Sequence, residues 1–136
     1  MSFELRPHTA DVAVEATGDD LAETFANVAA GLTAAHCDAV PDDVGDPLSV
    51  EVRAESREAL LFDYLDELIY LRDAREVLPT DHDVSIREDG EWTLEATLRG
   101  VPFDAVDARE IKAVTYSEMV LEETSSGWRA YVVFDV

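Results

Sequence analysis

The apolar residues of this chain recur with two different periods, and this change of period constrains the fold more than any other feature of the sequence. One set follows Asp20 at helical spacing and consists of Leu21, Phe25, Val28, Ala29 and Leu32. A second set follows Ser56 and consists of Leu61, Tyr64, Leu65, Leu68 and Leu71. Asp20, with Glu23 three residues later, and Ser56 are typical helix-capping residues. We therefore expect two amphipathic helices, one over residues 21–35 and one that begins after Ser56 and ends before Pro79.

Elsewhere apolar and polar residues alternate, which is typical of half-buried strands. The alternating segments cover residues 12–17, 48–56, 84–87, 92–99, 119–123 and 128–134. Asp89-Gly90 and Ser125-Ser126-Gly127 are hairpin turn signals, residues 79–83 are expected to form a loop, and residues 100–116 are less regular. Two helices and six or seven strands predict an α+β fold. We expect a single domain over residues 1–136, in which a mostly antiparallel sheet packs with two main helices.

The charge of the chain is strongly unbalanced, with 31 Asp and Glu against 10 Lys and Arg and a formal net charge of −21. Because the acidic residues are spread along the whole length, the folded surface is expected to be acidic throughout. Such a surface repels itself in dilute buffer, whereas at about 1 M salt the Debye length falls to about 3 Å. We therefore expect a halophilic source, whose high-salt cytoplasm supplies cations to this surface. The same charge argues against direct nucleic-acid binding, which needs a basic footprint.

Two further features bear on the compartment. The sequence has no apolar run near the ~20 residues that a membrane span requires, and residues 1–6 lack the features of a signal peptide. Cys37 is the only cysteine, which excludes an intrachain disulfide and any two-cysteine zinc or redox motif. These features predict a cytoplasmic protein with no membrane partner.

Residues that could carry chemistry are few, apart from the carboxylates. The chain lacks a phosphate-binding glycine loop, a nucleophile elbow and a metalloprotease helix. His8, His36 and His82 are scattered, so structural or solvent-facing roles are favoured over a zinc site. Carboxylates suit hard cations, although most single acids in so acidic a chain are solvated. Asp11, beside a strand start, and Asp135, at the end of the last strand, stand out by their setting, but their spacing alone does not pair them.

Four blocks of the sequence, in order, resemble the archease family. They are His8-Thr9-Ala10-Asp11, the helical segment 61–71, the segment 110–116 with Lys112, and the terminal Val133-Phe134-Asp135-Val136. Each block alone is a weak signal, whereas four blocks in the family's order over essentially the full chain make a chance resemblance improbable.

The resemblance implies a function and a metal site. Archeases act as the protein cofactor of the RtcB-type tRNA-splicing RNA ligase: they promote GTP-dependent guanylylation of the ligase and allow multiple turnover, without catalysing bond chemistry themselves. The family also binds a divalent cation, calcium or magnesium or manganese, through carboxylates that match Asp11 and Asp135, with Val136 able to add an oxygen. We therefore expect a non-catalytic protein with a cation cofactor and an RNA ligase as its partner.

The resemblance also implies partner-facing residues, namely His8, Lys112 and Tyr116. Lys112 is the only lysine, and a role as a surface charge partner is the simpler interpretation. The family commonly has histidine after the tyrosine, whereas this chain has Ser117, so a role of that histidine does not transfer. Asp63 and Glu67 have family counterparts too, and a structural position on the flank of the helix is the favoured interpretation for both.

Two other function classes stay open at this stage. In a metal-dependent phosphoesterase, Asp11 and Asp135 would hold a cation that activates water, with His8 as general acid or base. A general chaperone or modulator would use the acidic surface for loose contacts with basic partners. An enzyme would turn over phosphate substrates unaided, a chaperone would protect many clients, and an activator would need one ligase.

Overall fold

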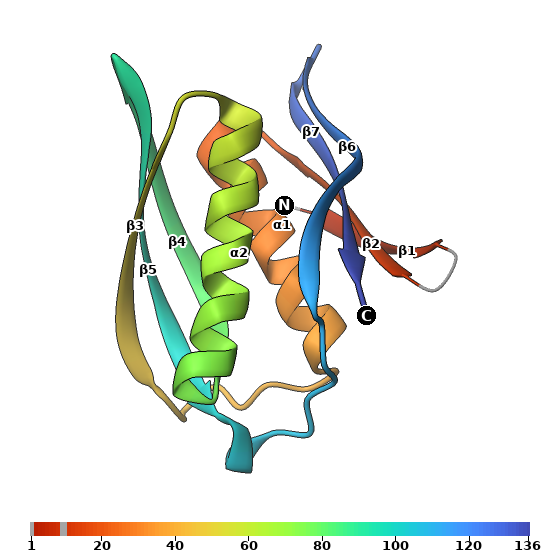
Figure 1. Cartoon of the computed structure of the whole chain (residues 1–136), viewed down its shortest axis with the longest axis vertical. Helices are drawn as coiled ribbons and strands as arrows, with labels where there is room; N and C mark the ends of the chain where they lie inside the picture. The colour runs from red at the N-terminus through yellow and green to blue at the C-terminus, as the bar shows by residue number, and fades with distance from the viewer. Residues whose placement is uncertain (1, 9–10) are drawn as a thin grey trace.

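Two helices lie side by side between two antiparallel sheets in the computed structural model of the chain (Figure 1). The structure describes residues 2–8 and 11–136. In chain order the elements are β1 (Ser2–His8), β2 (Asp11–Gly18), α1 (Leu21–His36), β3 (Asp46–Ala54), α2 (Arg57–Arg75), β4 (Val77–Asp89), β5 (Glu91–Pro102), β6 (Ala113–Thr124) and β7 (Gly127–Asp135), with a short 3-10 turn at Phe103–Ala105.

The strands divide into a four-stranded sheet of order β1-β2-β7-β6 and a three-stranded sheet of order β3-β5-β4. All neighbouring strands are antiparallel. Helix α1 packs near the edge strands β1 and β4, and α2 packs near the edge strands β3 and β6, so each helix closes one open side between the sheets (Figure 1). The expected α+β class with two helices and antiparallel strands is confirmed, whereas the division into two sheets was not anticipated from the sequence.

The helix starts follow from the caps that the sequence indicates. The Glu23 backbone N–H donates to the Asp20 side chain at 2.8 Å, and the Ala59 backbone N–H donates to the Ser56 hydroxyl at 3.1 Å. Each bond satisfies an N–H group that has no partner within the helix itself. Helix α2 ends where Glu76 adopts a left-handed conformation, with φ of 54°. Both expected helices are therefore confirmed, with ends within a few residues of the expected ones.

Two expectations about irregular segments are wrong. Residues 79–83 were expected to form a loop, but β4 runs through them from Val77, with a register shift between Thr80 and Asp83. An edge strand tolerates Pro79, which has no N–H to donate, and a bulge absorbs the irregular residues. Likewise β6 begins at Ala113 rather than at Met119, and its own register shift lies between Thr115 and Val120.

The core fills the space between the sheets around α2. Its largest fully buried side chains include Phe25 from α1, Leu60 and Tyr64 from α2, Leu94 from β5 and Phe134 from β7. Burial of these side chains provides the main driving force that holds the three layers together.

At one end of the molecule the side chain of Arg57 bridges the two sheets. The Arg57 guanidinium lies 5.0 Å from the ring centroid of Trp128 and 5.9 Å from that of Trp92. Such cation–π contacts connect β7 and β5 through the first turn of α2.

Candidate functional site

Asp11 and Asp135 lie directly opposite each other in neighbouring strands. Asp11 opens β2 and Asp135 closes β7, and the register of the two strands pairs them. The next pair, Val12 and Phe134, belongs to the core, so alternation along the strands places the two aspartates on the outer face of the sheet. Directly opposite side chains have Cβ atoms about 5 Å apart. The fold therefore brings together two carboxylates that are far apart in the sequence.

The same rim of the sheet carries other residues expected at the site. His8 is the register partner of Asp11 on β1, but its side chain lies outside the described residues, so its partner-facing role stays a prediction. The Lys112 backbone N–H donates to the Asp135 carbonyl at 2.8 Å, which fixes the end of β7. Lys112 is exposed, and Val136 follows Asp135 with 42% of its surface exposed.

The chemistry of this donor set favours a hard cation. Carboxylate and carbonyl oxygens are the ligands of Ca²⁺, Mg²⁺ and Mn²⁺, whereas structural zinc is bound mostly by Cys and His. Because Asp11 and Asp135 are directly opposite in register, one cation could be held by both carboxylates at once. Across the part of the chain that the structure describes, no group of three or more His, Cys, Asp and Glu side chains could hold a metal ion. Backbone oxygens, such as that of Val136, or water would therefore complete the coordination.

Tyr116 lies on the other side of the same sheet. Its ring stacks on Phe62 of α2, with centroids 4.2 Å apart and planes inclined by 8°. Tyr116 falls within the β6 register shift, where Glu118 has a positive φ of 57°. Desolvation, followed by the carboxylates Asp63 and Glu58, raises the pKa of the Tyr116 hydroxyl. The structure thus separates Tyr116, on the helix side, from the aspartate pair on the outer face.

His36, which is buried, and His82, which is half-buried, form two hydrogen-bonded groups that the sequence did not indicate. The His36 ring lies 3.0 Å from the Leu32 carbonyl through Nδ1 and 3.1 Å from an Arg72 guanidinium nitrogen through Nε2. Because Arg72 can only donate, His36 is neutral with its proton on Nδ1. Burial, followed by the Arg72 charge, lowers the pKa of His36 to about 4.

His82 connects α1, α2 and the β4 bulge. Its Nε2 lies 3.0 Å from the Thr33 hydroxyl and its Nδ1 3.3 Å from the Tyr64 hydroxyl. The Thr33 hydroxyl donates to the Pro79 carbonyl at 2.7 Å, so it accepts from His82, and Tyr64 then donates to Nδ1. Burial lowers the pKa of His82 to about 4 and raises that of Tyr64. Both histidines serve the fold, in line with the structural interpretation favoured from the sequence.

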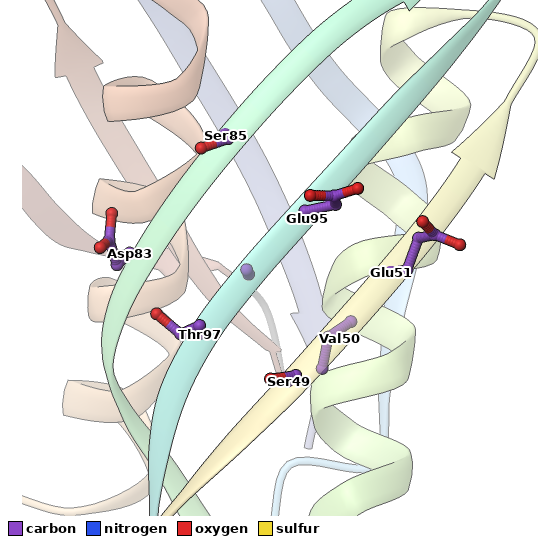
Figure 2. Close-up of a pocket in the computed structure, with 8 residues that line it drawn as sticks. Ser49, Val50, Glu51, Asp83, Ser85, Glu95 and Thr97 are labelled. Carbon is purple, nitrogen blue, oxygen red and sulfur yellow. The ribbon is translucent and has the colours of Figure 1, made fainter.

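A depression of about 440 Å³ lies on the outer face of the three-stranded sheet. Figure 2 shows Glu51 and Glu95 on neighbouring strands at this face, with Asp83 on the third strand. Glu95 accepts a hydrogen bond from Arg87 at 3.0 Å, and Glu51 lies 3.6 Å from Arg53. The depression is on the opposite sheet from Asp11 and Asp135, and two of its carboxylates are already neutralised, so we assign no chemistry to it.

No helix in the described ranges is long and apolar enough to cross a membrane. The structure defines a class: a small α+β protein with a helix pair between two antiparallel sheets and a pair of opposed carboxylates at the rim of one sheet.

Comparison with known proteins assigns the family. Residues 3–136 match the model of the Archease protein family (MTH1598/TM1083). The chain is 34% identical over 139 residues to protein archease of Pyrococcus furiosus, with 98% of both chains covered. It is 33% identical over 137 residues to protein archease of Archaeoglobus fulgidus, with 100% of both covered. This chain belongs to the archease family.

Solved structures agree with this assignment. The solution structure of protein 1598 of Methanobacterium thermoautotrophicum superposes with a TM-score of 0.86 at 31% identity, covering 98% of each chain. The crystal structure of an archease from Thermotoga maritima, described as a possible chaperone, gives a TM-score of 0.66 at 26% identity over 96% of each chain.

Proposed function

We propose that this protein is a non-catalytic activator of the RtcB-type tRNA-splicing RNA ligase in the cytoplasm of its host. In this role it promotes GTP-dependent guanylylation of the ligase and permits multiple turnover. Membership of the archease family over residues 3–136 supports the proposal, and the description of a relative as a possible chaperone is compatible with action on another protein. The family match carries the activator role, and the pairing of Asp11 with Asp135 on one rim of the sheet carries the role of the cation in it.

The rim residues have distinct roles in this proposal. Asp11 and Asp135 would hold a divalent cation, with Val136 as a further oxygen donor, and the cation would supply concentrated positive charge at the face presented to the ligase. The hydrogen bond from the Lys112 backbone N–H to the Asp135 carbonyl fixes the end of β7. This bond uses the main chain of Lys112, and the exposed Lys112 side chain would contact the partner.

Single-turnover guanylylation of the host's RtcB-type ligase tests the proposal. The reaction contains GTP and Mn²⁺ in concentrated KCl, with and without this protein. Wild type is expected to accelerate guanylylation at least tenfold, and Asp11→Asn to return the rate close to that of the ligase alone. Asp42→Asn is the matched control, because Asp42 is an exposed acid in the loop after α1 and its substitution changes the net charge equally.

The results separate the candidate functions. Stimulation that survives in Asp11→Asn would refute the role of the carboxylate pair while keeping the activator role. A folded wild type that does not stimulate the ligase would refute the activator role itself. Protection of unrelated unfolded clients from aggregation would then favour the chaperone role that the Thermotoga maritima structure suggests.

A further inference from the structure

The exposed side of α2 combines tyrosine rings with carboxylates. Among the large apolar side chains of the described residues, Tyr70 and Tyr116 are the two most exposed, at 60% and 53%. Phe62, Asp66 and Tyr70 follow one another at intervals of four residues, which places them in one row along the helix. Tyr116 joins this row from β6 through its stack on Phe62. We define the α2 face as Glu58, Asp63, Asp66, Glu67, Tyr70 and Tyr116.

Among the described residues, the ion pairs leave the carboxylates of the α2 face without an arginine partner, and here such carboxylates lie next to exposed tyrosine rings. In the described ranges, the ion pairs formed by arginines lie on the outer sheet faces, in the loops and at the last turn of α2. Within residues 11–136, Glu58, Asp63, Asp66 and Glu67 take part in none of these pairs. The neighbouring Arg57 is directed to Trp92 and Trp128 instead.

The Tyr116 ring and the carboxylates of α2 lie close together. The pKa of the Tyr116 hydroxyl rises through desolvation and through Asp63 and Glu58, so these two acids lie close enough to influence the ring. The stack on Phe62 holds the Tyr116 ring in a fixed orientation, although half of it is open to solvent. A fixed, exposed aromatic ring loses little conformational entropy when a partner binds.

These features define the chemistry of the partner. Guanidinium groups stack on tyrosine rings and form charge-assisted hydrogen bonds with carboxylates, and tyrosine is enriched among the residues that dominate binding energy. Nucleic acid and a second copy of this chain are both disfavoured, since each would bring negative charge to the acidic surface. We propose that the α2 face docks an arginine-bearing segment of a protein partner. The partner is the RNA ligase if the proposed function holds, and the chemistry of the docking face does not depend on that identity.

Binding of the host's ligase in concentrated KCl, measured by calorimetry, is the first test. Tyr70→Ala is expected to weaken binding at least tenfold, and Asp63→Asn combined with Asp66→Asn to weaken it several-fold.

The control combines Asp42→Asn with Asp43→Asn, which changes the net charge equally on an exposed loop and is expected to bind like wild type. Tyr70 is largely exposed, so its truncation leaves the core intact. Tyr116→Phe keeps the stack on Phe62 and is expected to retain most of the affinity.

A second test does not use the ligase. A short peptide of alternating glycine and arginine is titrated into the wild type, and NMR shift changes are mapped along the chain. Saturable changes centred on residues 58–70 and on Tyr116 are expected, together with their loss in Tyr70→Ala. Equal, unsaturated shifts over all acidic surfaces would overturn the docking face, as would ligase binding unchanged in Tyr70→Ala.

The two proposals fail in distinguishable ways. If the ligase neither binds nor responds to the wild type, the proposed function is refuted, and localised peptide binding would still support the α2 face. If the wild type stimulates the ligase and Tyr70→Ala does so equally at limiting protein concentration, the α2 face is refuted and the activator role stands.

Discussion

At the scale of single residues, buried His36 and half-buried His82 make the fold sensitive to mild acid. Both have pKa values lowered to about 4, against about 6.5 in an unfolded chain. Below pH 6.5 the unfolded chain gains protons that the folded protein does not bind, so stability falls with decreasing pH and levels off below about pH 4. From pH 7 to pH 5 this loss amounts to roughly 2 kcal/mol per histidine, since one pKa unit corresponds to about 1.4 kcal/mol.

Urea unfolding at pH 7 and pH 5 in concentrated KCl tests this expectation. Most of the expected loss falls in this window, because the unfolded histidines take up their protons there. His82→Gln should destabilise the protein at pH 7 by about 1–3 kcal/mol, because Thr33 and Tyr64 lose their partner. It should also reduce the difference in unfolding free energy between the two pH values by about half. An unchanged difference in the variant would show that His82 is not the buried neutral group described above.

At the scale of elements, the two hairpin glycines offer a matched comparison. Gly90 and Gly127 both have positive φ, of 81° and 151°. A Cβ on Gly90 would meet nothing within 4 Å, whereas a Cβ on Gly127 would clash with the carbonyl oxygen of Gly18 at the end of β2. Gly90→Ala should therefore cost about 1 kcal/mol from backbone strain alone. Gly127→Ala should cost about 3 kcal/mol or more, since the clash forces the β6–β7 hairpin away from β2.

Melting of the two glycine variants in the same buffer gives the comparison directly. Equal decreases in melting temperature for the two variants would mean that the backbone of Gly18 moves easily to accept the new Cβ. The β6–β7 hairpin would then not be held tightly against β2. That result would also weaken the case for a fixed position of Asp135, which lies on the same strand.

The elements also show how far local sequence information reaches. The caps Asp20 and Ser56 and the two turn signals depend on neighbouring residues, and they predicted both helices and both hairpins. The β4 and β6 bulges could not be predicted, because a register shift is defined by the partner strand. Pro79 therefore indicated a loop where the structure has an edge strand.

At the scale of the whole molecule, the candidate site depends on contacts that no short segment specifies. Asp11 and Asp135 meet only because β2 pairs with β7, which brings the two ends of the chain to one sheet. The burial of His36 and His82 arises in the same way, from the packing of α1 and α2 between the sheets. The family resemblance indicated the aspartate pair, whereas nothing local indicated the histidine groups or the stack of Tyr116 on Phe62.

Charge screening and specific cation binding should stabilise this protein separately. With a net charge of −21, the melting temperature is expected to rise steeply from dilute buffer to molar KCl, because screening removes self-repulsion. Millimolar Ca²⁺ added at constant high KCl should raise it further, since a ligand at 100 times its Kd stabilises by about 2.7 kcal/mol. Asp11→Asn combined with Asp135→Asn should abolish the Ca²⁺ increment and keep the KCl response. A Ca²⁺ increment that persists in this variant would place the bound cation elsewhere on the acidic surface, and a melting temperature independent of KCl would refute the expected adaptation to salt.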